Sequence, residues 1–244
     1  MNIMFLMGSS HIEKDKEDYP FYLTEINEKL VLEQQIEYCK ELKPAMHIFC
    51  VKEADIKQFR VDSVIKQIVS NAQIIPIANQ TCGAICTALL GYKYIANDDE
   101  LILMAVDDFV SDSSKKIVQD FRTKSADAGV VSFTSVHPRY SFAKTDEFGN
   151  VVQAEEKLPI SKNALVSFYY FRHGIDFTNC AMDVIRKDNP TKGNFYISQT
   201  LNEMILRQKK VVMHKISNDS FHPLKNELHL AQYIMDLKEN QRGK

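Results

Sequence analysis

Glycine is scarce in this sequence. The chain has 8 glycines in 244 residues, about 3%, whereas proteins contain roughly 7% on average. A phosphate-binding loop built from several glycines therefore has few places to form. Cysteine is also sparse: the five cysteines are an odd number without regular spacing. This usage is typical of reduced thiols and predicts a cytoplasmic protein.

The sequence also lacks an excess of one charge and any long apolar run. Lys and Arg number 30 against 32 Asp and Glu, for a formal net charge of -2. Such a chain offers no broad basic surface, so we expect no nucleic-acid partner. The longest apolar stretches, such as Leu101–Val106, fall far short of the roughly 20 residues of a membrane span. The opening residues MNIMFLMGSS have no basic region, so we expect neither a membrane span nor a signal peptide.

Short apolar runs alternate with longer amphipathic ones in the first half of the chain. The apolar runs predict buried strands of a parallel sheet at Asn2–Met7, Met46–Val51, Gln73–Ile77, Leu101–Val106 and Gly129–Ser135. The amphipathic runs predict helices at Glu28–Leu42, Ala84–Ile95 and Ser113–Ala128. Ser113 is a suitable N-cap for the last helix. Such alternation is typical of βαβ units.

The second half of the chain does not continue this regular alternation of strands and helices. Tyr140–Lys144 and Val151–Glu155 flank a polar, turn-rich stretch and predict a β-hairpin. Later patterns predict strands at Leu165–Phe171 and Val211–Ile216, and helices near Ile175–Lys187, Tyr196–Gln208 and Asn226–Glu239. We expect these elements to extend the same sheet. The sequence thus predicts an α/β fold with a mixed, mostly parallel central sheet flanked by helices, in a single domain of residues 1–244.

Polar residues follow two of the predicted strands, at the ends where open α/β sheets bind ligands. Gly8, Ser9 and Ser10 follow the first strand, and small residues there let backbone N–H groups approach a phosphate. A polar turn explains them equally well. Gln80 and Gly83 lie just before a predicted helix and could contact a base or a phosphate. A simple turn at the start of a helix is the alternative.

Two adjacent acids end a third strand. Asp107 and Asp108 come directly after the apolar run LILMAV. At the end of a buried strand they repel each other unless solvent, a cation or a hydrogen-bond network compensates. Mg²⁺ or Mn²⁺, which take oxygen ligands, would supply that compensation. Helix capping is the alternative for one of the two acids.

These segments, in this order, resemble the nucleotide-diphospho-sugar transferase superfamily, which has the GT-A fold, a nucleotidyltransferase-like Rossmann-type fold. The resemblance is closest to the sugar-phosphate nucleotidylyltransferase-like proteins of bacterial capsule and lipopolysaccharide gene clusters. It runs from Asn2 to about Tyr233. The best-matching stretches are Gln80–Thr87, Leu101–Asp108, His137–Lys144, Asp146–Ile160, Ala164–Phe171 and Gly193–Glu203.

The resemblance implies roles for individual residues. Asp107 and Lys157 would be catalytic, with Asp107 holding Mg²⁺ or Mn²⁺ against the nucleotide phosphates. The nucleotide itself would lie against a set of small and polar residues: Gly8, Ser9, Ser10, Gln80, Gly83 and Asp108. On the sugar side, Glu156 would accept hydrogen bonds from hydroxyls and Lys157 would neutralise the phosphate of a sugar phosphate. Asn202 would also contact this substrate, with Gly193–Asn202 forming the far wall of the cleft. Apart from the resemblance, Arg139 could bind a substrate phosphate through two guanidinium N–H groups, and a structural role of His137-Pro138-Arg139 is the alternative.

The sequence departs from the family at three positively charged or metal-binding positions. His11 stands where the family has a loop arginine, and Pro20-Phe21 where it has a Pro-Lys pair. Gln199 stands where a second metal-binding aspartate is usual. Nucleotidyl transfer depends on such groups. Lys14 and Lys16, in the Glu13–Tyr19 loop, could replace the missing charge, and solvated surface lysines are the alternative.

Three functions follow from these residues. The first is a nucleotide-sugar-type transferase, with a sugar 1-phosphate attacking the α-phosphorus of a nucleoside triphosphate, in bacterial surface polysaccharide synthesis. The second is a glycosyltransferase with the same fold, which uses a nucleotide sugar. The third is a non-catalytic nucleotide- or sugar-binding protein. The resemblance also implies a homodimer as one possible state, because this superfamily often forms dimers.

Overall fold

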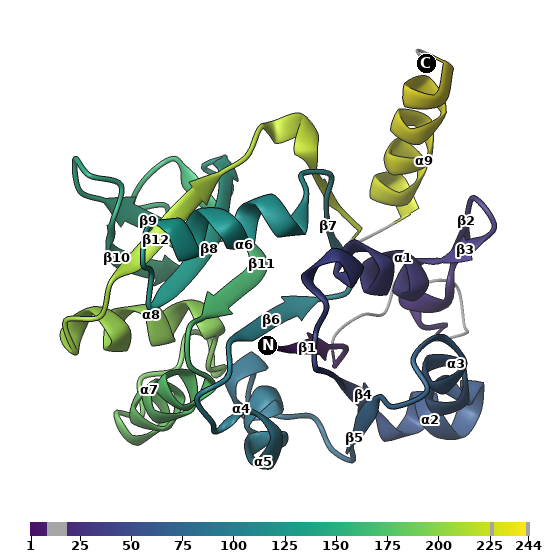
Figure 1. Ribbon diagram of the computed structural model, residues 1–244, viewed down its shortest axis with the longest axis horizontal. Helices are drawn as coiled ribbons and strands as arrows, with labels where there is room; N and C mark the ends of the chain where they lie inside the picture. Colours follow the sequence, from purple (N-terminus) through teal and green to yellow (C-terminus); the bar gives the residue numbers. More distant parts are fainter. Residues whose placement is uncertain (9–18, 225–226, 243–244) are drawn as a thin grey trace.

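A nine-stranded mixed sheet organises the molecule. The computed structural model describes residues 1–8, 19–224 and 227–242 (Figure 1). Seven strands follow the order β10-β9-β11-β6-β1-β4-β5, and β8 joins the sheet by pairing with β11 and β12. The strands are β1 (Asn2–Leu6), β4 (Met46–Lys52), β5 (Gln73–Ile77), β6 (Leu101–Ala105), β8 (Ala128–Thr134), β9 (Ser141–Thr145), β10 (Val151–Glu156), β11 (Asn163–Phe171) and β12 (Val211–Lys215).

Helices cover both faces of this sheet. They are α1 (Val31–Tyr38), α2 (Glu53–Phe59), α3 (Val61–Ile68), α4 (Ala84–Leu89), α5 (Tyr92–Ile95), α6 (Ser114–Thr123), α7 (Gly174–Arg186), α8 (Ile197–Leu206) and α9 (Glu227–Arg242). Short 3-10 turns occupy Phe21–Leu23, Lys40–Leu42 and Asn218–Ser220. Two small ribbons complete the described elements: β2 (Glu25–Ile26) with β3 (Lys29–Leu30), and β7 (Asp108–Val110) with β13 (Phe221–Pro223). No helix within the described residues is long and apolar enough to cross a membrane.

The alternation of strand side chains builds two hydrophobic cores. In β1, Ile3 and Phe5 point into a core that includes side chains of α1, α3 and α6. Met4, between them, points into the opposite core, where α4, α5, α7 and α8 contribute. Because both faces of the central strands are buried, these strands are almost continuously apolar. This explains why the sequence pattern predicted them within a residue or two.

Pairing in the sheet confirms the mixed architecture. β6, β1, β4 and β5 are parallel neighbours, and β12 is parallel to β8. β11 runs antiparallel to both β6 and β8, and so connects the two halves of the chain in one sheet. β9 and β10 form the predicted hairpin, whose turn is held by the Asp146 carboxylate accepting from the backbone N–H groups of Phe148 and Asn150. The α/β prediction is confirmed.

Two helix predictions were too long. The helix expected from Glu28 begins at Val31, because Asn27 and Glu28 adopt left-handed backbone angles and turn the chain between β2 and β3. The helix expected over Ala84–Ile95 is broken at Gly91 into α4 and α5. A Cβ at Gly91 would lie 2.5 Å from the Met4 side chain. The chain therefore passes closer to the sheet there than a continuous helix with side chains allows.

A third helix also ended early. α6 stops at Thr123, and the residues from Ala128 belong to β8. Its predicted N-cap is confirmed, since Ser113 Oγ accepts a hydrogen bond from Lys116 N at 3.4 Å. Helices α2 and α3 were not predicted, although α3 is strongly amphipathic, with Val61 and Ile65 fully buried.

Candidate functional site

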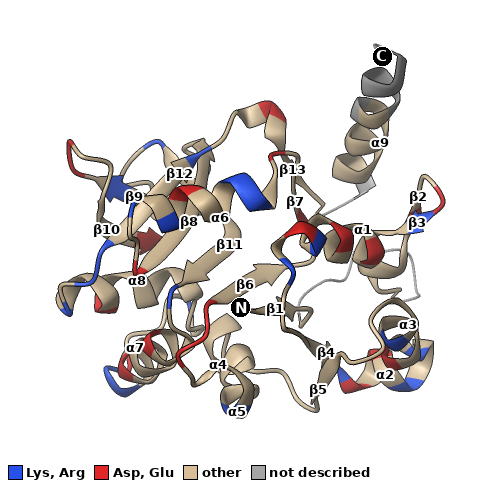
Figure 2. Ribbon diagram, in the orientation of Figure 1, with Lys and Arg blue, Asp and Glu red and all other residues tan. Residues whose placement is uncertain are grey.

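A cavity of about 770 Å³ lies at the carboxyl ends of the parallel strands, within the size range of small-molecule sites. The central strands β1, β6 and β11 carry no charged residue, and the charges lie on loops, on helices and on other strands (Figure 2). The charged residues that line the cavity are Lys52, Asp107, Asp108, Arg139, Glu156 and Lys157. The cavity therefore combines an apolar floor with a few charged groups at its edges.

Of the paired acids, Asp107 lies in the turn that follows β6 and Asp108 begins β7. Asp107 and Asp108 both line the cavity and are only 8% and 7% exposed. Asp108 Oδ2 accepts a hydrogen bond from the backbone N–H of Ser167 on β11, at 3.1 Å. The buried Gln35 of α1 donates to the Asp108 carbonyl oxygen at 2.9 Å. These bonds hold the turn in place, and a strand rather than a helix follows it, so neither acid caps a helix.

The chemistry of these two side chains suits a hard divalent cation. Carboxylate oxygens are the ligands that Mg²⁺ and Mn²⁺ prefer. The described residues contain no group of three or more His, Cys, Asp or Glu side chains that could hold a metal. A cation at Asp107 would take further ligands from outside these two side chains, such as water, as Mg²⁺ commonly does.

Glu156 and Lys157 reach the same cavity from the hairpin. Adjacent residues of a regular strand point to opposite faces, so both can line the cavity only if the strand stops. β10 ends at Glu156, and Lys157 has a φ of 58°. This departure from strand geometry lets both side chains face the cavity. The Lys157 ammonium donates to Tyr196 Oη at 2.6 Å.

Hydroxyl groups hold the carboxylate of Glu156. Ser141 Oγ and Ser198 Oγ both donate to Glu156 Oε2, the latter at 2.7 Å. Oε1 has no hydrogen bond from a described residue. Burial raises the pKa of the Glu156 carboxyl, against the opposing effect of the two hydroxyls and of Lys157. Burial also raises the pKa of Tyr169 nearby, and the charges of Glu156 and Asp108 add to this effect.

Gly83 joins two walls of the cavity. The backbone N–H of Phe195 donates to Cys82 O at 2.8 Å, and Ile85 N donates to Phe195 O at 3.1 Å. Gly83 sits inside this contact with φ of 106°, and a Cβ there would lie 2.4 Å from the Phe195 carbonyl oxygen. The glycine is therefore required for close packing of the Gln80–Ala84 segment against the 194–197 wall, whatever it contacts in a ligand.

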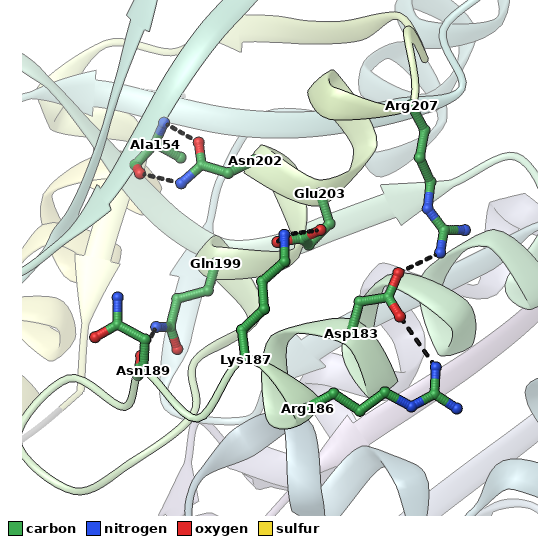
Figure 3. A network of polar contacts seen from close by, with 9 residues as sticks. All are labelled: Ala154, Asp183, Arg186, Lys187, Asn189, Gln199, Asn202, Glu203 and Arg207. Carbon is green, nitrogen blue, oxygen red and sulfur yellow. Dashed lines mark hydrogen bonds and ion pairs between the residues drawn. The ribbon is translucent and has the colours of Figure 1, made fainter.

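Other predicted site residues have different surroundings. Gly8, Gln80 and Arg139 line the cavity, and the Arg139 guanidinium lies 4.9 Å from the centre of the Tyr140 ring. Asn202 does not line it: its side chain is bonded at both ends to the backbone of Ala154 on β10 (Figure 3). Ser9 and Ser10, together with His11, Lys14 and Lys16, lie outside the described residues.

Gln199 has a structural role in α8. Its Oε1 accepts from Tyr196 N at 2.8 Å, and its Nε2 donates to Asn189 O at 3.0 Å (Figure 3). One end of the amide caps α8 and the other binds the segment that follows α7. Gln199 does not line the cavity, so this position supplies no second acid for a metal.

Ion pairs fix α8 against α7. Lys187 of the α7 C-terminus donates to Glu203 of α8 at 2.6 Å, and Asp183 bridges Arg186 and Arg207 (Figure 3). Exposed pairs of this kind each contribute little to stability. Together with the Asn202 bonds to β10, they position the N-terminal part of α8, which carries Ser198.

Solved structures with the same fold are known, although sequence comparisons find no match. No protein-family model and no curated protein matches this sequence. Among solved structures, a nucleoside-diphosphate-sugar pyrophosphorylase from Vibrio cholerae matches with a TM-score of 0.76 at 19% identity, over 96% of this chain and 100% of that one. The chain has the nucleotidyltransferase-like fold. The resemblance seen in the sequence, from Asn2 to about Tyr233, is thereby confirmed at the level of fold.

Two further structures share the nucleotidyltransferase-like fold. A Bacillus anthracis protein assigned as a glucose-1-phosphate thymidylyltransferase, crystallised with sucrose, has a TM-score of 0.74 at 15% identity, over 96% of this chain and 93% of that one. HddC from Yersinia pseudotuberculosis has a TM-score of 0.68 at 16% identity, over 97% and 99%. At such identities the likeness establishes the fold, and the activity has to be argued from the residues of the site.

Several residues in or beside the cavity escaped the sequence reasoning. Lys52 ends β4 and lines the cavity. The rule that pointed to Asp107, a charged residue directly after an apolar run, could have found it. Ser141, Ser198 and Tyr196 carry no comparable signal, because their positions near Glu156 and Lys157 depend on how the hairpin and α8 pack together.

Proposed function

We propose that this protein binds a nucleotide and a sugar phosphate in the cavity and acts as a transferase of the nucleotide-sugar type. The finer proposal is a sugar-phosphate nucleotidylyltransferase-like activity in the cytoplasm, serving bacterial surface polysaccharide synthesis. One observation carries it: Asp107, Glu156 and Lys157 line a single cavity at the strand ends of a nucleotidyltransferase-like fold. They come from β6 and from the hairpin, far apart in sequence.

Each group has a task in such a reaction. The sugar phosphate lies with its phosphate at the Lys157 ammonium and its hydroxyls at Glu156, whose Oε2 is held by Ser141 and Ser198. This placement directs a phosphate oxygen of the sugar 1-phosphate toward the α-phosphorus of the nucleotide, and pyrophosphate leaves as the new bond forms. Asp107 would hold Mg²⁺ or Mn²⁺, which when bound neutralises charge on the nucleotide phosphates.

A first experiment measures thermal stabilisation by the five common NTPs and by nucleotide sugars, with and without Mg²⁺ or Mn²⁺. A coupled assay then follows pyrophosphate release with sugar 1-phosphates. Asp107→Asn should abolish the metal-dependent part of the stabilisation. Asp219→Asn, an exposed acid outside the cavity, is the matched control and should behave as wild type. Stabilisation by nucleotide sugars with Mn²⁺ and without pyrophosphate chemistry would indicate a glycosyltransferase instead.

A non-catalytic binding protein is the second candidate. The observation in its favour is Gln199, whose amide caps α8 where the resemblance places a second metal-binding acid. In that case the nucleotide stabilises the protein without any metal dependence, and no sugar 1-phosphate releases pyrophosphate.

A further inference from the structure

The positive charges of the cavity lie on two different walls. Arg139 precedes β9 and Lys157 follows β10, so both belong to the hairpin side. Lys52 ends β4, and three strands of the sheet, β11, β6 and β1, separate β4 from the hairpin. Neighbouring strands lie roughly 4.8 Å apart. Lys52 is therefore too far from the hairpin cations to share one small anion with them.

Lys52 lies beside the turn that follows β1. Leu6 pairs with Cys50, and the backbone N–H of Met7 still donates to Cys50 O at 3.0 Å. Gly8, which comes next, lines the cavity together with Lys52. On its other side β1 pairs with β6, whose end leads into Asp107. Lys52 and Asp107 thus stand on either side of the β1 turn, with Gly8 between them.

The side chain of Lys52 has no counter-charge in the part of the chain that the structure describes. It is half-buried and makes no ion pair or hydrogen bond with any residue that the structure describes. By contrast, Lys57, one turn further along, pairs with Glu53 at 2.7 Å. A partly buried ammonium without a counter-charge favours an anionic ligand, because the ligand compensates for its lost solvation.

We propose that Lys52 binds the phosphates of the nucleotide, beside Gly8 and across from Asp107, while Lys157 and Arg139 bind the phosphate of the sugar phosphate. The cavity then holds two anionic groups at separate cationic points, with the acids of the β6–β7 turn between them. This assignment rests on the proposed function. It gives the nucleotide end of the site a phosphate-binding lysine from β4.

The test uses two small probes, one for each end. Inorganic pyrophosphate and glucose 1-phosphate are titrated separately, by calorimetry at fixed ionic strength and Mg²⁺, into wild type, Lys52→Ala and Lys157→Ala. Lys52→Ala should weaken pyrophosphate binding tenfold or more and leave glucose 1-phosphate within twofold. Lys157→Ala should do the reverse. Lys66→Ala, an exposed lysine of α3 outside the cavity, is the matched control and should change neither affinity.

A variant that keeps the positive charge at position 52 distinguishes a binding role of Lys52 from a structural one. Lys52→Arg should keep pyrophosphate affinity within about threefold, and thermal unfolding of each unliganded variant shows whether it is folded. The proposal is overturned by equal pyrophosphate affinity of wild type and Lys52→Ala, by equal losses for both probes in both variants, or by a wild type that binds neither probe. Lys52-dependent pyrophosphate binding without any response to NTPs or nucleotide sugars would support the lysine assignment and reject the nucleotide function.

Discussion

Glu156 combines a buried carboxylate with two hydroxyl donors in the cavity. Burial raises its folded-state pKa above that of an exposed carboxyl, roughly 4.3. Between these two values the folded protein binds more protons than the unfolded chain, so stability falls as pH rises through this window. Above this window the buried Glu156 carboxylate is charged at a cost in stability. A ligand that donates hydrogen bonds to it from hydroxyl or ammonium groups reduces this cost.

We expect Glu156→Gln to flatten this pH dependence. The neutral amide fits the same hydroxyls without ionising, so the unfolding temperature of the variant should fall less than that of wild type between pH 4.5 and 7. Thermal unfolding across this range, in buffers of equal ionic strength, measures the difference. Glu155→Gln, the neighbouring acid outside the cavity lining, should leave the wild-type profile in place. If the unfolding temperatures of Glu156→Gln and wild type change equally with pH, burial does not raise the pKa of Glu156 as argued.

Gly83 is required both by its backbone conformation and by its close packing against Phe195. Gly83→Ala places a Cβ 2.4 Å from the Phe195 carbonyl oxygen and forces a side chain into φ of 106°. Backbone strain of this kind costs about 1–3 kcal/mol, and the overlap with Phe195 adds a further 1–3 kcal/mol or so. Urea unfolding should show a larger loss for Gly83→Ala than for Gly149→Ala.

Gly149 is the matched position because it also has a positive φ, 82°, and has nothing within 4 Å of an added Cβ. Its replacement measures the strain alone. Equal losses for the two variants would mean that the 80–84 segment moves away from Phe195 without resistance.

Helix α8 is positioned from two sides, by ion pairs to α7 and by the Asn202 side chain on β10. Asn202→Ala removes both bonds to Ala154 and leaves a partly buried edge of β10 unsatisfied. We expect a loss of about 1–3 kcal/mol in unfolding free energy, measured with urea. Asn179→Ala, a half-buried asparagine of α7 whose side chain bonds to no described residue, should lose less than half of that.

The same variant tests the substrate contact that the resemblance implies for Asn202. If Asn202 acts through α8, the stability loss appears without ligand and any loss of glucose 1-phosphate affinity is small, about twofold. A variant of wild-type stability with a tenfold weaker affinity would favour direct contact with substrate.

At the scale of the whole molecule, β11 pairs with β6 of the first half and with β8 and β9 of the second. The sheet is therefore continuous across the middle of the chain. A division near residue 110 would expose the edge of β6 and both hydrophobic cores, since each core draws on the two halves. A single domain over residues 1–244 stays a prediction, which unfolding experiments can test.

We expect the protein to unfold in one cooperative transition. Far-UV circular dichroism and differential scanning calorimetry should report the same midpoint, and a bound ligand at 100 times its Kd should raise it by about 5–10 °C, from roughly 2.7 kcal/mol of linkage. Two separate transitions, or a ligand that shifts only one of them, would contradict a single unit.

The sequence by itself determined the elements whose identity rests on local patterns. Short, mostly apolar runs bounded by polar residues predict strands, and Gln73–Ile77 was predicted to the residue even though β5 lies at the edge of the sheet. The hairpin was recognisable from its turn, and Asp107 from a charge placed directly after an apolar run. The breaks at Val31 and Gly91 were not, because a left-handed turn and a close approach to Met4 involve contacts outside the pattern.

Only the tertiary structure decided which residues share the cavity. Lys52, Glu156 and Asp107 come from strands that are distant in sequence and meet because of the sheet order β10-β9-β11-β6-β1-β4-β5. Ser198 reaches Glu156 because α8 packs on β10. Asn202 bonds α8 to β10, and Gln199 caps the start of α8. Side-chain type and spacing set what each residue can do chemically, whereas the partner it meets depends on long-range packing, which a single sequence does not encode in any local pattern.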